Sequence, residues 1–251
     1  MHIFRVIAFS LIFFSSILML AGCGGDNSSS SGNAGSIGPG VLDGTYNNGS
    51  LLYPVTAAVM SDGSVGFDIG NGVVFYGQLG TNNTIIGSEN ISPNAIVIMS
   101  ANMNGSGQLV VEITQGAYAL NSGDTFTLSY TDIYERTSTL SNLTGTWSGN
   151  NVIMTGGSGS SQPWSITFQS DGSFAGSSGD INISGNAALV DATKNEYAIS
   201  MTLSHDSINY SLLGNYEGFA FLTDSSAMND TLAIFMKRTS ADEYLGTLIL
   251  Q

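Results

Sequence analysis

The stretch Trp164-Ser165-Ile166-Thr167-Phe168-Gln169-Ser170-Asp171-Gly172-Ser173-Phe174 decides the fold class. Its large apolar side chains alternate with polar ones, so Trp164, Ile166 and Phe168 share one face of a predicted strand. Asp171-Gly172 then favours a hairpin turn, because Asp-Gly accepts the positive φ angles that such turns require. An apolar strand face followed directly by such a turn is typical of an antiparallel sheet.

The same period of two recurs along the chain, and no stretch after residue 40 keeps a helical period of 3.6 over three turns. In the second half it predicts eight strands, near residues 144–149, 163–169, 173–178, 181–187, 196–204, 213–222, 231–238 and 244–250. Eight short antiparallel strands with one apolar face form either a barrel or a sandwich. Sequential hairpins favour an up-and-down barrel, because closure removes exposed strand edges.

A repeated pair of motifs organises the chain after residue 40. Leu42-Asp43-Gly44-Thr45-Tyr46 is echoed by Leu143-Thr144-Gly145-Thr146-Trp147, and Met60-Ser61-Asp62-Gly63-Ser64-Val65 by Gln169-Ser170-Asp171-Gly172-Ser173-Phe174. Similar elements in the same order predict tandem domains. We therefore expect an N-terminal β-domain at 41–140 and a C-terminal β-barrel domain at 141–251, joined near 136–142.

The Gly145-Thr146-Trp147 motif is similar to the one that opens the first strand of lipocalin-like barrels. The resemblance covers three residues and implies an eight-stranded up-and-down barrel for the C-terminal domain. The expected fold class is thus all-β, with two tandem antiparallel β-domains. Whether residues 41–140 close into a barrel or form a smaller sheet stays open.

The charge balance excludes several classes of partner. The chain has five Lys and Arg against 19 Asp and Glu, which gives a formal net charge of −14. Nucleic acids and anionic lipid surfaces attract proteins through clustered Lys and Arg, which this chain lacks. We therefore expect no nucleic-acid partner and interpret the acidity as a soluble surface.

The first 22 residues have the features of an export signal peptide. Arg5 supplies the positive start, Val6 to Leu20 form an apolar run, and the small residues Ala21 and Gly22 precede Cys23. The apolar run is shorter than the roughly 20 residues that a spanning helix needs. Leu20-Ala21-Gly22-Cys23 resembles the lipobox of bacterial lipoproteins at all four positions.

The lipobox resemblance implies that signal peptidase II cleaves before Cys23 and that the Cys23 sulfur carries a diacylglyceryl group. Two or more acyl chains then anchor the protein stably in a membrane. Gly24 stands where enterobacterial lipoproteins of the inner membrane carry Asp, so the resemblance favours the outer membrane. Residues 23–40 are rich in Ser, Gly and Asn and predict a flexible tether.

Residues that could carry catalysis are scarce. His205 is the one histidine after the signal segment, and its neighbours in sequence point to opposite faces of a strand. One histidine and one lipidated cysteine cannot make a zinc or copper site. We expect no catalytic residue, no metal site, no cofactor and no enzyme activity, while calcium held by loop Asp and Asn oxygens stays open.

Four aromatic residues form the candidate ligand-binding set: Trp147, Trp164, Phe168 and Tyr197. They either fill the second barrel or line a cavity in it, because eight strands leave little space beyond side chains. The expected function is a non-enzymatic cell-envelope lipoprotein that binds another envelope protein or a polymer. The alternative is a lipocalin-like carrier of a small apolar ligand.

Replacing the cysteine tests the anchor directly. Cys23→Ser removes the sulfur that would receive the lipid, so we expect the unprocessed precursor to accumulate and membrane retention to be lost. Fractionation of the cells and the intact mass of the protein measure both effects. Unchanged fractionation and mass would contradict the lipoprotein interpretation.

Overall fold

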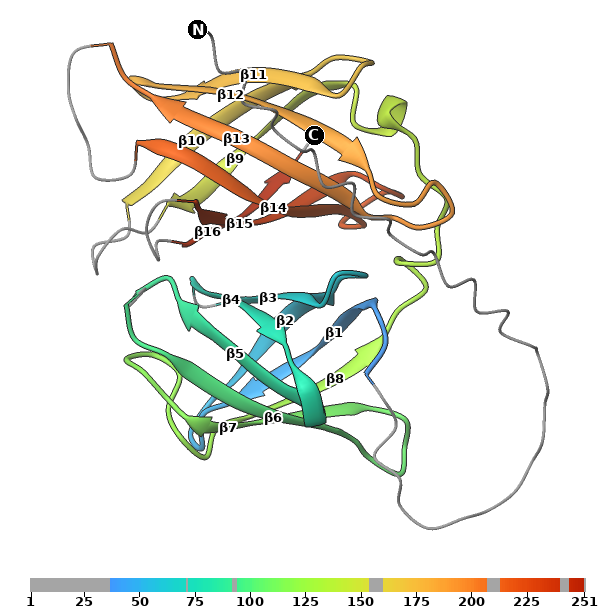
Figure 1. The fold of residues 1–251 in the computed structure, drawn as a ribbon, viewed down its shortest axis with the longest axis vertical. Helices are drawn as coiled ribbons and strands as arrows, with labels where there is room; N and C mark the ends of the chain where they lie inside the picture. Colours follow the sequence, from blue (N-terminus) through green and yellow to red (C-terminus); the bar gives the residue numbers. More distant parts are fainter. Residues whose placement is uncertain are drawn as a thin grey trace, which may run out of the picture. The chain divides into compact units, whose positions relative to one another are not determined.

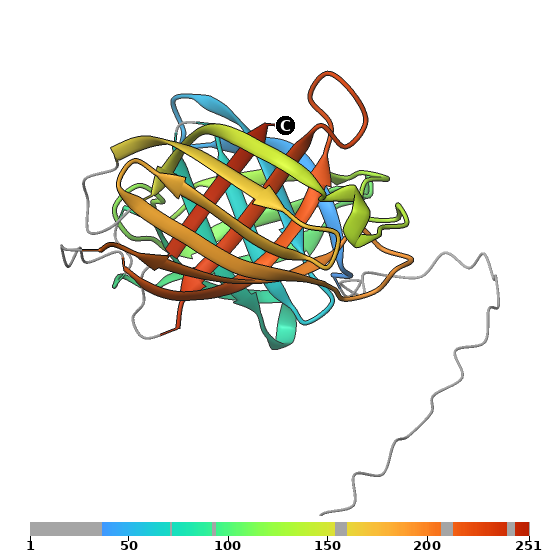
Figure 2. The ribbon, with the colours of Figure 1, turned by 90° about the horizontal axis from the view of Figure 1, so that it is seen from above.

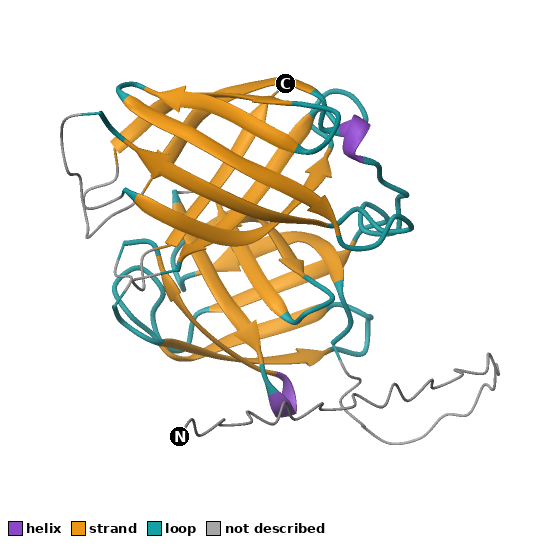
Figure 3. Ribbon diagram, turned by 45° about the horizontal axis from the view of Figure 1, so that its top comes forward, coloured by secondary structure: helices purple, strands orange, loops and turns teal. Residues whose placement is uncertain are grey.

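The computed structural model describes residues 37–70, 72–91, 94–153, 160–206, 213–239 and 244–250. They form two antiparallel eight-stranded barrels in which each strand pairs with the next one along the chain (Figure 1). Among these described residues, strands account for nearly all the regular structure, and helix is limited to two short 3-10 turns (Figure 3). The all-β, tandem-domain prediction is confirmed, and the first half also closes into a barrel.

The first barrel consists of β1 (Gly40–Asn47), β2 (Leu52–Val59), β3 (Ser64–Ile69), β4 (Val73–Leu79), β5 (Thr84–Glu89), β6 (Val97–Met103), β7 (Leu109–Gln115) and β8 (Thr125–Tyr130). The 3-10 turn η1 (Thr81–Asn83) connects β4 to β5. Strand β1 returns to β8 over a register that runs from Leu42 opposite Tyr130 to Asn47 opposite Thr125. This pairing closes the sheet and leaves no edge strand.

The second barrel consists of β9 (Gly145–Ile153), β10 (Ser160–Phe168), β11 (Ser173–Ser178), β12 (Ile181–Leu189), β13 (Tyr197–Ser204), β14 (Gly214–Thr223), β15 (Thr231–Arg238) and β16 (Tyr244–Leu250). It follows the 3-10 turn η2 (Leu140–Asn142). Its strands wrap obliquely around the interior (Figure 2), and β16 returns to β9 at Leu245 opposite Ile153 and Leu250 opposite Ser148. All eight strands predicted for this half are present, with limits shifted by a few residues.

The repeated motifs occupy equivalent positions in the two barrels. Tyr46 lies in the first strand of one barrel and Trp147 in the first strand of the other, and both are buried. The Ser-Asp-Gly-Ser motifs form the hairpin between the second and third strands of each barrel, with φ of +83° at Gly63 and +88° at Gly172. The hairpin prediction is therefore confirmed, and in each turn the glycine adopts the left-handed conformation while the preceding aspartate does not.

The first barrel begins before residue 41. Ile37 is buried in its core, the Tyr130 hydroxyl donates to the Gly38 carbonyl at 3.1 Å, and Gly40 opens β1. Residues 37–40, which the composition assigns to the tether, thus belong to the folded domain. Ile37 is the one large apolar residue of the predicted tether, and transfer of its side chain from water to the core stabilises this part of the segment in the barrel.

A third apolar cluster joins the outer faces of the two barrels. The described residues from Ile37 onward belong to one compact unit. The cluster contains Val41, Ala58, Met60, Val74, Tyr76, Ile133, Tyr134, Phe219, Phe221, Ala233 and Phe235. Ring centroids lie 5.9 Å apart for Tyr76 and Phe219 and 5.3 Å apart for Phe219 and Phe235. Residues 219–222 of β14 and 232–236 of β15 are consequently buried on both faces of the sheet.

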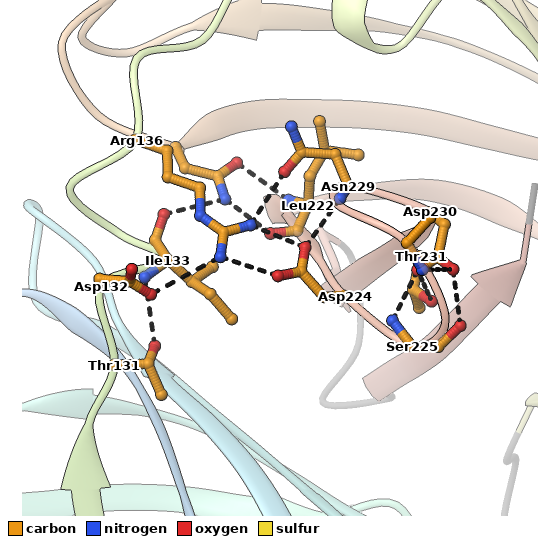
Figure 4. A network of polar contacts seen from close by, with 12 residues as sticks. Thr131, Asp132, Ile133, Arg136, Leu222, Asp224, Ser225, Asn229, Asp230 and Thr231 are labelled. Carbon is orange, nitrogen blue, oxygen red and sulfur yellow. Dashed lines mark hydrogen bonds and ion pairs between the residues drawn. The ribbon is translucent and has the colours of Figure 1, made fainter.

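The segment between β8 and β9 is fastened to the second barrel by polar contacts (Figure 4). Arg136, the one basic residue between Arg5 and Lys194, holds the Asp224 carboxylate through two hydrogen bonds of 2.7 and 2.8 Å. Its guanidinium also donates to Asn229 Oδ1 at 3.3 Å. Two parallel bonds of this kind fix the direction as well as the distance of the pair.

A buried carboxylate, Glu196, connects this segment with both barrels. It accepts hydrogen bonds from the Tyr134 hydroxyl and the Ser61 hydroxyl, both at 2.9 Å, and from the Ser61 N–H at 3.3 Å. Its neighbour Asn195 donates to the carbonyls of Ile133 and Leu222 and accepts from the Leu222 N–H. These bonds satisfy the buried polar atoms, which would otherwise destabilise the interface.

Gly66 tests how tightly the interface packs. A methyl group at Gly66 would lie 2.5 Å from the Phe235 ring and 3.0 Å from Phe219 Cζ. We expect Gly66→Ala to lower the free energy of unfolding in urea by about 1–3 kcal/mol, because overpacking forces the rings to shift. In Gly105→Ala, the control, the added methyl meets nothing within 4 Å. Equal losses in the two variants would show that the interface tolerates the extra volume.

Candidate functional site

The four candidate aromatic residues are brought together inside the second barrel. Trp147, Trp164, Phe168 and Tyr197 are at most 2% exposed and belong to one core cluster. Trp147 Nε1 donates to the Leu143 carbonyl at 2.7 Å, the Tyr197 hydroxyl donates to the Thr139 carbonyl at 3.2 Å, and the Phe168 ring lies 4.7 Å from that of Phe174. These three side chains therefore have structural contacts, as expected for a filled barrel.

The residues of the predicted lipobox, Leu20, Ala21, Gly22 and Cys23, lie outside the described part of the chain, so lipidation remains a prediction. His205 follows the end of β13. In the described ranges, no group of three or more His, Cys, Asp and Glu is arranged to hold a metal ion. Neither of the two 3-10 turns in the described ranges is long and apolar enough to cross a membrane.

A second fully buried carboxylate, Glu89, has a structural role. Its two oxygens accept hydrogen bonds of 2.8 to 3.0 Å from the backbone N–H groups of Tyr118, Ala119 and Leu120. These hydrogen bonds fasten the loop between β7 and β8 to the carboxylate. Because Glu89 is fully buried and each of its oxygens already accepts two hydrogen bonds, it is not available to a ligand.

An open polar groove lies where the two barrels meet, and it is the candidate functional site. Its volume is about 470 Å³. The first barrel contributes Asp62, Ser64, Tyr76 and Gln78, and the second contributes Asn186, Ala188, Ala198, Ile199, Ser200, Glu217, Gly218 and Lys237. Binding sites occur preferentially between domains, where a few polar groups converge.

Strand register explains why the floor of the groove is polar. Asn186 lies opposite Ser200, Ser200 opposite Glu217, and Glu217 opposite Lys237, so one row of side chains crosses β12, β13, β14 and β15. All four are exposed. On β14 and β15, the residues two positions away from Glu217 and Lys237 on the same face are Phe219 and Phe235. Both are buried in the cluster between the barrels. The polar row therefore begins where the apolar interface ends.

The wall of the groove is a short chain of hydrogen bonds in the first barrel. Asp62 accepts from the Ser64 N–H at 2.7 Å and from its hydroxyl at 3.0 Å. Gln78 Nε2 donates to the Asp62 carbonyl at 2.8 Å, and the Tyr76 hydroxyl donates to Ser64 Oγ at 3.4 Å. These contacts pre-organise the wall, because they restrict the rotamers of the side chains that face the groove.

The sequence did not indicate this groove. Alternation correctly places Asn186, Ser200 and Glu217 on the outer face of their strands, but many other polar residues share that pattern. Their alignment in one row depends on the pairing of four strands, and register between strands is a tertiary property. Aromatic character, the signal on which Trp147, Trp164, Phe168 and Tyr197 are candidates, instead points to the barrel interior.

Asp68 is the carboxyl group whose titration burial alters most clearly. It lies on β3, on the same face as Ser64 and Gly66, and burial raises its pKa from 3.8 to about 6. In contrast, the backbone N–H groups of Ser225, Ser226 and Ala227, together with the Ser226 hydroxyl, lower the pKa of Asp230. Asp230 is thereby held ionised as the anchor of its own loop (Figure 4).

The raised pKa of Asp68 predicts a pH-dependent stability. Between pH 3.8 and about 6 the unfolded chain loses the Asp68 proton while the folded protein keeps it, so the free energy of unfolding falls as pH rises. We expect Asp68→Asn to be more stable than the natural protein at pH 7, by on the order of 1 kcal/mol, and to lose this advantage near pH 4. Urea unfolding at both pH values measures it.

The control for this comparison is Ser177→Ala, which changes an exposed residue of the second barrel that carries no titratable group. We expect its effect to be the same at pH 4 and pH 7. If the advantage of Asp68→Asn were also independent of pH, Asp68 would not titrate between these values in the folded protein.

Comparison with known proteins adds no functional assignment to this geometry. No family model matches the chain, and no curated protein matches it.

Proposed function

We propose that the protein is a non-enzymatic cell-envelope lipoprotein that is anchored through Cys23, in the outer membrane, and binds an envelope partner through the groove between its barrels. The observation that carries the proposal is the open groove of about 470 Å³ with polar side chains from both barrels. A site formed by two domains holds a ligand only while the domains stay docked. The buried contacts of Glu196 and the apolar cluster provide that rigidity.

The chemistry of the groove favours binding over catalysis. Among the residues that line it, the ionisable groups apart from Tyr76 are Asp62, Glu217 and Lys237. Glu217 and Lys237 are exposed neighbours on paired strands, and Asp62 already accepts two hydrogen bonds from Ser64. Catalytic acids and bases usually lie in clefts where burial and neighbouring groups adapt them for proton transfer. An exposed set of hydroxyl, amide and charged groups is instead suited to recognising a polar surface.

A carrier function is the second candidate, and one observation favours it. Within the described residues, Trp164 Nε1 and Ser178 Oγ are buried without a hydrogen-bond partner. They lie on the paired strands β10 and β11, where Trp164 is next to Ser165 and Ser178 is next to Ser177, the residue opposite Ser165. A buried indole N–H usually finds an acceptor. A small molecule with a carbonyl or carboxylate oxygen would supply one inside the second barrel.

Site-specific photocrosslinking distinguishes these functions. A photoreactive residue at Ser200 faces the groove, whereas one at Ser177 faces outward from β11, away from the residues that line the groove. In cells that make the protein naturally, we expect a covalent adduct with an envelope component from position 200 and none from position 177. Mass spectrometry identifies the adduct. Adducts from both positions, or from neither, would contradict recognition through the groove, and a carrier leaves position 200 without an adduct.

A further inference from the structure

We infer that the groove binds a neutral carbohydrate chain, an inference that rests on the proposed function and names its ligand class. A second hollow of about 320 Å³ adjoins the first and shares Ser200 and Glu217 with it. The two hollows thus lie side by side, with Ser200 and Glu217 between them. The combined groove runs from the first barrel across the outer face of β12, β13 and β14, which suits an extended chain better than a compact molecule.

Two parallel rows of polar side chains form the floor of this combined groove. The first row is Asn186, Ser200, Glu217 and Lys237. The second row lies two residues along each strand and contains Ser184, Thr202 and Asn215, with a hydrogen bond of 2.9 Å from Thr202 Oγ1 to Asn215 Oδ1. Neighbouring strands are about 4.8 Å apart, so each row offers polar groups at a regular interval.

The polar groups of the floor are complementary to sugar hydroxyl groups. Hydroxyl and amide side chains both donate and accept hydrogen bonds, and so does each hydroxyl of a sugar. Ala188 and Ala198 lie opposite each other on paired strands, and both are exposed beside the first row. Their methyl groups form a shallow apolar shelf on which the C–H face of a sugar ring can rest.

Charge disfavours the alternative polymers. The groove contains the carboxylates of Asp62 and Glu217 against the single ammonium of Lys237, in a chain of net charge −14. An anionic chain would be repelled, because binding of phosphate or sulfate groups requires clustered Lys and Arg. A cationic peptide finds carboxylates too few and too exposed for strong ion pairs. A neutral chain makes hydrogen bonds without either penalty.

Titration calorimetry with defined probes tests the inference. The neutral probes are maltohexaose, cellohexaose and chitohexaose; a heparin hexasaccharide is the anionic probe and hexalysine the cationic one. We expect at least one neutral probe to bind with a Kd between about 10 μM and 1 mM. Its affinity should change by less than about twofold between low and high salt, because no ion pair forms.

A matched pair of variants locates the binding. Ser200→Tyr fills the shared part of the groove and should weaken binding at least about tenfold, which corresponds to about 1.4 kcal/mol. Ser177→Tyr adds the same bulk to an exposed position on β11 and should leave binding unchanged. The double change Asn186→Ala with Glu217→Ala removes polar atoms without adding bulk and should also weaken binding. Thermal melts establish that each variant is folded.

Three results would overturn the carbohydrate assignment: no neutral probe binds at about 1 mM, Ser200→Tyr and Ser177→Tyr have equal effects, or hexalysine binds in place of the sugars. These results leave the groove itself testable. If crosslinking at Ser200 then captures a protein, the proposed function stands and only the ligand class is wrong. If position 200 captures nothing, both proposals fail.

Discussion

The packing of apolar side chains between two closed sheets is the constraint on which the rest of the structure depends. A closed barrel has no edge strand, so two barrels cannot be joined by extending a sheet. They can adhere only through side chains on their outer faces. Phe219, Phe221 and Phe235 meet this requirement on one side, and Val41, Met60 and Val74 meet it on the other. Burying each such ring or aliphatic group stabilises the contact by about 1.5–3 kcal/mol.

Polar groups give this apolar contact a defined geometry. Apolar side chains attract one another without regard to direction, whereas the Glu196 carboxylate accepts hydrogen bonds only where Tyr134 and Ser61 are correctly placed. A buried carboxylate that lost these partners would destabilise the protein strongly. The arrangement of the barrels, and with it the groove, is therefore restricted to positions that keep Glu196 satisfied.

The fold could be predicted from the sequence because it follows from local alternation. Runs such as Tyr197 to Leu203 place every second side chain in the barrel interior, and the Asp-Gly turns set the hairpins. The apolar interface between the barrels is not among the sequence-based predictions, although one sequence pattern indicates it. In residues 219–222 and 232–236 the apolar side chains are consecutive, which is typical of strands that are buried on both faces. The groove left no such signal, because its row from Asn186 to Lys237 depends on register across four strands.

The ion pair of Arg136 with Asp224 also bears on the resistance of the protein to proteolysis. Trypsin-like proteases cut after Lys or Arg, and Arg136 is the one such residue in the chain between Arg5 and Lys194. It lies in the segment between the barrels, where a single cut would break the covalent link between them. Its guanidinium is held by Asp224 and Asn229, and its backbone N–H donates to the Ile133 carbonyl at 3.3 Å, whereas a protease binds its substrate in an extended conformation. The contacts that fasten the connecting segment thus also hinder cleavage after Arg136.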